Sequence, residues 1–463
     1  MNVVDETAVP VTHIAKGVEV QGSALEFGRG TARFTTPALE LDALVWSRKA
    51  PGPAFDVPLA EIMDILVATG QWLAADPQGM VQHALDFSAR TSPLPREVLE
   101  RSYQGMSRLF ERRTMQFQVD QELGGSDVLD GWRAVCDAPS GRQHSVRAFP
   151  PRLVHVIAGN APGVAATTIV RGALTKGVHL LKLPSNDLFT ATAILRGMAA
   201  VAPGHALVRS FSAAYWRGGD EAVERLLFRP QFFDKLVAWG GTSTLLSARQ
   251  YIGPGFELVS FDPKTSISMI GREAFESDET LAAVAEAAAI DATVMNQQAC
   301  VSSRIQFVEG GVAEVDRYCA ALHARLGIAR PSCSATQPPP PAALCEEIDV
   351  LRDMAPDYRV WGGYDGRGLV IRSDEPVDFH PDNRTVNVIP VARLEDAVPH
   401  ANVATQTVGI YPTHRKAALR DALASAGVQR VVGLGRAGSM EMGLSHDGFL
   451  PLQRFVRWVN DEE

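Results

Sequence analysis

The sequence predicts an α/β fold in which a parallel, doubly wound sheet is followed by a second α/β segment. Between residues 153 and 239, short apolar runs typical of buried strands alternate with stretches of helical periodicity. Parallel strands are joined by crossover helices, so this alternation indicates a parallel sheet. Two glycine-rich loops directly follow predicted strands, where the ligand crevice of a doubly wound sheet lies.

The first part of the chain predicts small strands, then helices, then a hairpin. Residues 1–60 mix short alternating runs with Pro and Gly, whereas apolar residues recur at helical spacing from Leu59 to about Gln118. Residues 130–148 predict a hairpin that turns at Pro139-Ser140-Gly141. Because an isolated hairpin is only marginally stable in water, we expect a partner to cover it.

A strand–loop–helix–strand unit follows. Leu153–Ala158 predicts a strand, Gly159–Gly163 a tight loop, Val164–Thr175 a helix, and Val178–Leu183 the next strand. The alternation continues with a helix over Phe189–Val201 and strands over Ala206–Val208 and Lys235–Trp239. The loops at Gly159 and at Gly240-Gly241 stand where a dinucleotide would bind. Neither is a GxGxxG, and tight turning alone would also explain them.

The second α/β segment, from about Ser260 to about Arg430, contains the connection with the most distinctive chemistry. An Ala-rich run, Leu281–Ile290, predicts a buried helix, and the alternation over Arg304–Val308 predicts a strand. Cys300 lies between them, where a side chain is held firmly and can face a cleft. A thiol there can act as a nucleophile if the site favours its thiolate, although a small buried hydrophobe is the alternative for any isolated cysteine.

Two further stretches have their own composition. The proline-rich segment Gln337–Pro341 predicts a surface loop or short linker. Gly443–Trp458 is rich in aromatic and Arg residues, so we expect it to pack on another surface.

Composition argues against several classes of protein. A net charge of −9 argues against nucleic acid as a partner, and 46% hydrophobic with 21% charged residues is ordinary for a soluble globular enzyme. No apolar run has the length of a membrane span, and the start lacks the features of a signal peptide. The five cysteines are sparse and irregularly spaced, which argues against a disulfide framework and favours a reducing cytoplasm. Neither cysteines nor histidines show a metal-binding spacing, so we expect no metal site.

Five short motifs stand in an order and at spacings that resemble one family. They are GNAPG at residues 159–163, LLKLPSND at 180–187, VAWGGT at 237–242, NQQAC at 296–300 and SHDGFLPLQRFVRW at 445–458. Over roughly residues 120–460 the chain resembles the aldehyde dehydrogenase superfamily and, within it, the LuxC-type long-chain acyl-CoA reductases. The resemblance implies an aldehyde dehydrogenase-like fold, with a Rossmann-type cofactor domain, an α/β catalytic domain and a small oligomerisation hairpin.

The resemblance also implies domain boundaries. Residues 1–130 would add strands and helices to the cofactor domain, and residues 131–148 would form the oligomerisation hairpin. The NADP-binding domain would span residues 149–259, the catalytic domain 260–430, and a C-terminal oligomerisation segment 431–463. We therefore expect a homo-oligomer, either a dimer or a tetramer.

Individual residues receive roles from the same resemblance. Cys300 corresponds to the catalytic cysteine, and Asn160 to an asparagine whose amide donates to the oxyanion. Lys182 stands where the family places a lysine at the adenosine ribose, and Gly240-Gly241 replaces the Gly-Ser pair that lets backbone approach the pyrophosphate. Without the family, a turn would explain Asn160, and a solvated strand end would explain Lys182.

One departure from the family concerns the cofactor. Aldehyde dehydrogenases that prefer NAD carry a glutamate three residues after the lysine, whereas this chain has Ser185. Loss of that carboxylate removes repulsion against a 2′-phosphate, so NADPH is the expected cofactor and NADH the alternative. Arg217, in the loop Trp216–Gly219, could pair with that phosphate, but a surface arginine explains it equally well.

A second departure concerns deacylation. The glutamate base that activates water in the oxidising members falls at Ser260, and the nearby Asp262 need not share its reach. Without that base the thioacyl enzyme should survive long enough to meet a hydride or another thiol, which favours the reductive direction.

These features predict an NADPH-dependent enzyme that reduces an acyl thioester, such as a fatty acyl-CoA or acyl-carrier-protein thioester, to an aldehyde through an acyl-Cys300 intermediate. A partner protein that transfers the acyl group is one possibility. His446, in the stretch Ser445–Gly448, would gate the site, shuttle a proton or have a structural role alone. The alternatives are a cofactor-independent cysteine acyl-transferase or thioesterase, a non-catalytic scaffold, and an aldehyde-oxidising dehydrogenase. The identity of the acyl group stays open.

Overall fold

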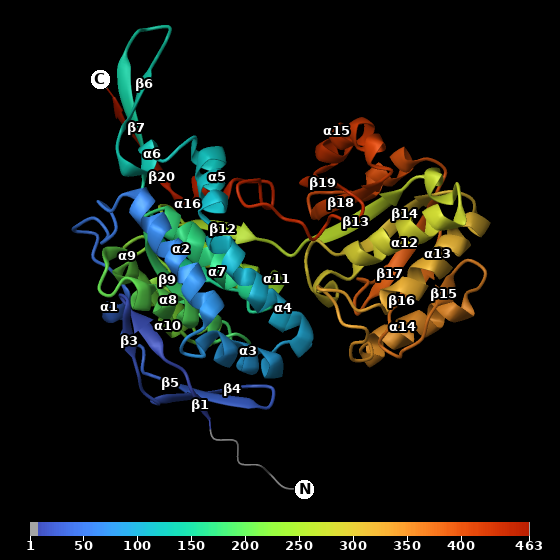
Figure 1. Ribbon diagram of the computed structural model, residues 1–463, viewed down its shortest axis with the longest axis horizontal. Coiled ribbons are helices and arrows are strands. Elements are labelled where there is room, and N and C mark those ends of the chain that lie inside the picture. The colour runs from blue at the N-terminus through green and yellow to red at the C-terminus, as the bar shows by residue number, and fades with distance from the viewer. Residues whose placement is uncertain (1–7, 463) are drawn as a thin grey trace. The chain divides into compact units, whose positions relative to one another are not determined.

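The computed structural model describes residues 8–462 and divides into two compact units. The first unit holds the chain up to Asp262 and again from Glu441, and the second unit holds Pro263–Met440. Each unit is built on a seven-stranded sheet packed with helices (Figure 1). Residues 431–440 therefore belong to the second unit, and the last part of the chain belongs to the first.

The N-terminal segment forms small strands and then a set of helices, as the sequence predicts. One small sheet has the order β1-β5-β4, with strands Val9–Pro10, Ala32–Thr36 and Leu25–Arg29. Strands β2 (His13–Ala15) and β3 (Val18–Val20) instead extend the large sheet beside β10. The helices are α1 (Leu41–Leu44), α2 (Leu59–Ala75), α3 (Met80–Thr91), α4 (Arg96–Met106), η1 (Ser107–Phe110), α5 (Arg112–Leu123) and α6 (Asp127–Asp130).

The large sheet of the first unit has the order β12-β11-β8-β9-β10-β2-β3. Its parallel part consists of β8 (Arg152–Val156), β9 (Val178–Lys182), β10 (Phe211–Ala214), β11 (Lys235–Trp239) and β12 (Glu257–Phe261). The helices between these strands are α7 (Pro162–Leu174), α8 (Thr190–Val201), α9 (Ala206–Arg209), α10 (Glu221–Leu227) and α11 (Thr242–Arg249). Because β8 lies between β9 and β11, the direction of winding reverses at β8, and the predicted doubly wound sheet is confirmed.

The predicted strand over Ala206–Val208 is wrong. These residues begin the short helix α9, and the strand that follows, β10, starts at Phe211. The side chain of His205 caps the helix, since its Nδ1 accepts a hydrogen bond of 3.1 Å from the Leu207 backbone N–H. A short apolar run has no readable periodicity, so sequence alone could not distinguish a helical turn from a strand here.

The predicted hairpin is confirmed, and the C-terminus adds a third strand to it. Strands β6 (Arg133–Cys136) and β7 (Gln143–Phe149) pair antiparallel, and β20 (Arg457–Glu462) pairs with the other edge of β7. Just before β20, helix α16 (Pro451–Phe455) is tied to α5, because the Leu452 backbone N–H donates to the buried carboxylate of Glu122. The C-terminal segment thus packs on the first unit, as its composition predicts.

The sheet of the second unit has the order β15-β16-β17-β14-β13-β18-β19 and is parallel except for β15. Its strands are β13 (Thr265–Ile270), β14 (Ser303–Glu309), β15 (Arg359–Trp361), β16 (Leu369–Arg372), β17 (Thr385–Val391), β18 (Thr405–Tyr411) and β19 (Arg430–Gly433). Its helices are η2 (Arg272–Phe275), α12 (Asp278–Ala292), η3 (Val294–Gln297), α13 (Val312–Leu326), α14 (Ala342–Asp353), η4 (Leu394–His400), η5 (Thr413–Arg415) and α15 (Lys416–Ala426). The predicted Ala-rich buried helix is α12, and the strand predicted after Cys300 is β14.

Small residues let α12 pack closely in the core of the second unit. Ala285, Ala288, Ala289 and Ala292 are fully buried in one cluster with residues of β14, α13 and β17. The helix begins at an N-cap serine, Ser277, whose Oγ accepts a hydrogen bond of 3.1 Å from the Thr280 backbone N–H. Its far end leads directly into η3 and the loop that carries Cys300.

Over residues 8–462, no helix combines the length and the apolar character needed to cross a membrane.

Candidate functional site

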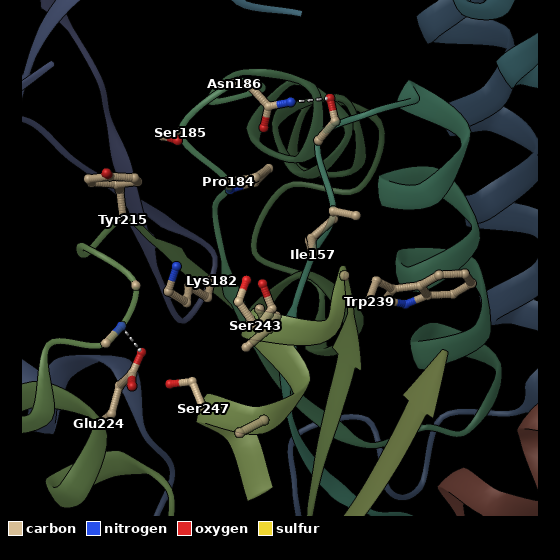
Figure 2. Close-up of a pocket in the computed structure, with 18 of the residues that line it drawn as sticks. Ile157, Lys182, Pro184, Ser185, Asn186, Tyr215, Glu224, Trp239, Ser243 and Ser247 are labelled. Carbon is tan, nitrogen blue, oxygen red and sulfur yellow. Dashed lines mark hydrogen bonds between the residues drawn. The ribbon is translucent and has the colours of Figure 1, made fainter. Parts of the chain in front are cut away.

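A cavity of about 500 Å³ opens at the carboxyl ends of the parallel strands of the first unit, where the winding reverses (Figure 2). This is the place at which doubly wound sheets bind ligands, and the volume suits a small-molecule site. The loops after β8, β9, β10 and β11 all contribute to its wall, through residues that include Ile157, Gly159, Lys182, Ser185, Asn186, Tyr215, Gly218, Gly240 and Ser243.

Two glycines of the wall are required by close packing. A Cβ added at Gly159 would lie 2.3 Å from Asn186 Oδ1, and one at Gly240 would lie 2.9 Å from the Cβ of Thr244. Asn186 also donates from Nδ2 to the Gly159 carbonyl oxygen at 2.9 Å, which ties the loops after β8 and β9 together. Gly241 is the N-cap residue of α11 and lies outside the cavity wall, with open space where its Cβ would be.

The wall carries one cationic and one anionic side chain, Lys182 and Glu224. Lys182 ends β9 and is only 8% exposed, and its Nζ lies 5.5 Å from the Trp216 ring. Burial lowers the pKa of the Lys182 ammonium to about 8, an effect that the negative charge of Glu224 partly offsets. The cavity therefore offers a positive charge that titrates close to neutral pH.

The residues expected to discriminate between NADP and NAD occupy different places. Ser185, which the resemblance places where NAD-preferring aldehyde dehydrogenases carry a glutamate, lines the cavity in the loop after β9. Arg217 is exposed and is not part of the cavity wall, although its neighbours in the same loop, Tyr215, Gly218 and Gly219, are.

Asn160 stands in the loop between β8 and α7, next to Gly159. Its side chain is exposed, and its amide makes no hydrogen bond within residues 8–462. The helix that follows begins at Pro162, so the amide lies within one turn of a helix N-terminus, where partial positive charge favours an anion. An uncommitted amide at this place can donate to a developing oxyanion.

Cys300 lies in the second unit, on a loop with a constrained backbone. Just before it, Met295, Asn296 and Gln297 all adopt left-handed φ values of 50°, 51° and 69°. Non-glycine residues hold this conformation only where the surroundings impose it, and such strain concentrates at functional sites. Cys300 itself is partly exposed, and its carbonyl oxygen accepts a hydrogen bond of 2.8 Å from Ser266 Oγ on β13.

A fully buried arginine, Arg384, supports the loop that carries Cys300. Its Nη2 donates to Asn296 Oδ1 and to the Ser334 carbonyl oxygen, both at 2.7 Å, and its Nη1 donates to the Ala335 carbonyl oxygen at 3.0 Å. Asn296 Nδ2 in turn donates to Ser334 Oγ at 3.0 Å. Nothing in the neighbourhood of Arg384 along the chain marks it as a partner of the cysteine loop, so sequence alone does not point to it.

Gln297, which follows Asn296 in the loop that carries Cys300, is held by residues other than Arg384. Gln297 donates from Nε2 to the Thr385 carbonyl oxygen at 3.0 Å, and its own carbonyl oxygen accepts from the guanidinium of Arg304. Strand β17 and the start of β14 thus fix the segment that delivers Cys300. This support is what lets three consecutive left-handed residues persist.

His446 packs in the first unit against aromatic residues. Its ring centroid lies 5.3 Å from that of Trp239 and 4.9 Å from that of Phe261, in edge-to-face geometry. Trp239 lines the cavity and stacks on Phe261 at 3.6 Å, so His446 buttresses a residue of the cavity wall. Next to it, Asp447 accepts a hydrogen bond of 3.1 Å from the Asp262 backbone N–H.

Of the predicted site residues, Gly159, Lys182, Ser185 and Gly240 line one cavity, while Gly241 and Arg217 flank it. Asn160 adjoins that cavity along the chain, and Cys300 belongs to the other unit. The described part of the chain contains no group of three or more His, Cys, Asp or Glu side chains placed to hold a metal ion.

Comparison with known proteins gives a family model, described as acyl-CoA reductase (LuxC), that matches residues 54–458. A long-chain acyl-protein thioester reductase of Aliivibrio fischeri is 30% identical over 364 residues, covering 74% of this chain and 70% of the relative. The enzyme of the same name from Vibrio harveyi is 29% identical over 349 residues, with 74% and 70% coverage.

Solved structures show the same fold at low sequence identity. A NAD-dependent benzaldehyde dehydrogenase from Corynebacterium glutamicum superposes with a TM-score of 0.72 at 14% identity, covering 100% of both chains. An NADP-dependent glyceraldehyde-3-phosphate dehydrogenase from Bacillus halodurans, complexed with NADP, gives 0.70 at 12% identity and covers 98% of this chain and 99% of its own. The predicted aldehyde dehydrogenase-like fold is confirmed.

Proposed function

Because the chain belongs to the acyl-CoA reductase (LuxC) family, we propose that it uses NADPH to reduce a long-chain acyl thioester through an acyl-Cys300 intermediate. The family assignment confirms the predicted reaction class, an aldehyde-forming reduction of an acyl thioester. The observation that carries the cofactor proposal is the cavity at the switch point of the sheet. A cofactor-independent acyl-transferase would not need such a cavity.

The cavity fits a nicotinamide dinucleotide in its residues as well as its position. Gly159 and Gly240 keep the backbone of two loops close to the cavity, and Lys182 supplies a buried positive charge for a phosphate or ribose. Ser185 leaves its own side of the wall without a carboxylate that would repel a 2′-phosphate. When bound, the nicotinamide supplies the hydride that reduces the acyl carbon.

The chain's own residues carry the covalent steps. The thiolate of Cys300 attacks the carbonyl carbon of the thioester, the substrate C–S bond breaks, and the donor thiol leaves with the acyl group now on Cys300. The amide of Asn160 and the Cys300 backbone N–H donate to the oxygen as negative charge develops there. After reduction of the acyl carbon, the C–S bond to Cys300 breaks, the aldehyde departs and the thiolate is regenerated.

The deacylation site supports reduction over hydrolysis. Ser260, which the resemblance places at the position of the glutamate base of oxidising aldehyde dehydrogenases, lies on β12 and is half-buried, and its side chain has no carboxylate with which to activate water. Asp262 leaves the strand and joins Asp447 through its backbone N–H. We infer that water does not compete effectively for the acyl group on Cys300.

The names of the relatives indicate which acyl donors should be tested. The relatives are named long-chain acyl-protein thioester reductases. An acyl group on a protein thiol, delivered by a transferring partner or a carrier protein, is therefore a donor to test beside acyl-CoA.

The three-stranded sheet of β6, β7 and β20 is the proposed contact between copies in a dimer or tetramer. The proposal is supported by three exposed apolar side chains on or beside this sheet, those of Trp132, Val135 and Trp458. A reducing compartment such as the cytoplasm keeps the thiol of Cys300 active.

The test of the proposed function is NADPH absorbance on mixing the protein with a panel of acyl-CoAs and acyl-carrier proteins. We expect a loss of absorbance with an equal amount of aldehyde formed. Release of free thiol without NADPH consumption would instead identify an acyl-transferase or thioesterase. NADPH formation from NADP and an aldehyde, with the acid as product, would identify an aldehyde oxidiser.

Affinity for NADPH should fall as the pH rises through about 8. Below that pH the Lys182 ammonium is charged and attracts the anionic cofactor; above it the buried amine is neutral. Linkage then predicts that the Kd rises by at most about tenfold per pH unit above this point. Fluorescence titration of the protein with NADPH at a series of pH values measures it, with Lys182→Met as the control. If Lys182→Met shows the same pH dependence as the natural protein, Lys182 is not the group responsible.

A further inference from the structure

Glu224 is a buried carboxylate in the cavity wall that no sequence motif identified. It lies on α10, is 4% exposed, and accepts three hydrogen bonds. Oε1 accepts from Trp216 Nε1 at 3.3 Å and from the Gly219 backbone N–H at 3.2 Å; Oε2 accepts from the Tyr251 hydroxyl at 3.0 Å. All three partners can donate, which is the pattern that an ionised carboxylate requires.

Those bonds fix the direction of the carboxylate. Trp216 follows β10, Gly219 lies in the loop before α10, and Tyr251 follows α11, so three separate segments hold one side chain. Figure 2 shows Glu224 across the cavity from Ser185, with its bond to the Gly219 N–H drawn. The carboxylate cannot turn away from the cavity without losing these partners.

Glu224 and Lys182 meet the same loop from two sides. A Cβ added at Gly218 would lie 3.8 Å from Lys182 Nζ, and the neighbouring Gly219 donates to Glu224. Within residues 8–462 Lys182 makes no hydrogen bond or ion pair, so its charge is available to a ligand. Glu224 stays close enough to raise the pKa of that ammonium, although burial has the larger, opposite effect.

From this arrangement we propose that Glu224 is a specificity-determining residue: its fixed carboxylate opposes a 2′-phosphate and so narrows the preference of the cavity for NADPH over NADH. The inference rests on the proposed function, since it assumes that the cavity binds the adenosine end of a nicotinamide dinucleotide. Ser185 stands on one wall of the cavity, where the resemblance places the glutamate of NAD-preferring aldehyde dehydrogenases. Glu224 places a carboxylate on the opposite wall. The two residues therefore act in opposite directions on the same choice.

The experiment separates the effect of the negative charge of Glu224 on nucleotide binding from the effect of the shape of its side chain. In Glu224→Gln the amide oxygen can still accept from Trp216 and Gly219, and the amide nitrogen can donate to the Tyr251 oxygen, so the packing stays while the charge is lost. Tyr251→Phe is the matched control, because it removes one partner of Glu224 and keeps its charge. Glu224→Ser removes the charge with a different shape and guards against a folding defect peculiar to one variant.

The measurement is the Kd of NADPH and of NADH for each protein, by fluorescence titration at constant pH and ionic strength. We expect the ratio of the NADH Kd to the NADPH Kd to rise about fivefold in both charge-removing variants and to stay unchanged in Tyr251→Phe. An unchanged ratio in variants that still bind both nucleotides would overturn this inference alone. Failure of the natural protein to bind either nucleotide would overturn the proposed function and this inference with it.

Discussion

Cys300→Ala should abolish aldehyde formation, with kcat reduced by at least about 10,000-fold. In the proposed mechanism the thiol of Cys300 forms the bond to the acyl group, and the other four cysteines lie elsewhere. Cys319 and Cys333 are buried in the second unit, Cys345 lies on α14 with its thiol donating to the Pro340 carbonyl oxygen at 3.6 Å, and Cys136 lies on the hairpin strand β6. Loss of a nucleophile removes the covalent route as a whole and leaves only binding, so the effect should fall on kcat. NADPH consumption and aldehyde release, measured together under saturating thioester, give the result.

Cys136→Ala is the matched control for that experiment. It removes an exposed thiol from a strand that contributes nothing to the cavity or the cysteine loop, so activity should be unchanged. Labelling with an acyl-CoA should also attach the acyl group to the natural protein and to Cys136→Ala, but not to Cys300→Ala. Appreciable reductase activity in Cys300→Ala would show that Cys300 is not the nucleophile. Inactivity of the natural protein, with a Cys300 no more reactive toward iodoacetamide than the other cysteines, would favour the scaffold.

Local patterns in the sequence were enough to predict the sheet and the edge of the sheet at which the cavity lies. The glycine loops after β8 and β11, and the Ala-rich helix α12 before Cys300, all lie where the alternation of strands and helices put them. These features depend on residues close together in the chain, and their periodicity is imposed by burial. The predicted reaction class came from five short motifs whose order and spacing resemble one family, and the family model that matches residues 54–458 confirms that class.

The residues that position the cysteine loop and line the cavity from a distance along the chain could not be predicted from such local patterns. Arg384 is 88 residues from Asn296 along the chain, yet its guanidinium holds the amide that shapes the cysteine loop. Glu224 gave no signal in the sequence, because a glutamate in a short amphipathic helix is usually a solvated one. Both act through contacts that only the fold creates. A local pattern can locate a nucleophile, but it does not show what positions it.

For Arg217, the sequence could suggest a role but could not predict the direction of the side chain. Its place in the loop Trp216–Gly219 made it a candidate partner for a 2′-phosphate, with an ordinary surface arginine as the equal alternative. In the structure the backbone of that loop faces the cavity at Gly218 and Gly219, while Arg217 is exposed beside it. The direction of one side chain in a short loop depends on the packing of its neighbours, here Trp216 against Glu224.

Asn160→Ala should lower kcat by about 100-fold to 1,000-fold and leave the KM for the thioester nearly unchanged. The amide is proposed to donate to the oxyanion, whose charge develops only as the thiolate attacks, so its loss should be felt in the transition state and not in binding. The structure supports this role through one contrast. The amide of Asn160 is exposed and uncommitted within the described residues, whereas that of Asn186, on the facing loop, is already bonded to the Gly159 carbonyl.

Asn186→Ala is accordingly the matched control, since it removes the same group from the same cavity edge. Its amide supports the loop after β8, and its Oδ1 occupies the space that a Cβ at Gly159 would fill. We expect that variant to raise the KM for NADPH several-fold with a smaller effect on kcat, the reverse of Asn160→Ala. Steady-state kinetics with both substrates varied separates the two patterns. If Asn160→Ala changed only KM, or if the two variants behaved alike, Asn160 would be a support of the loop and the oxyanion would depend on backbone donors.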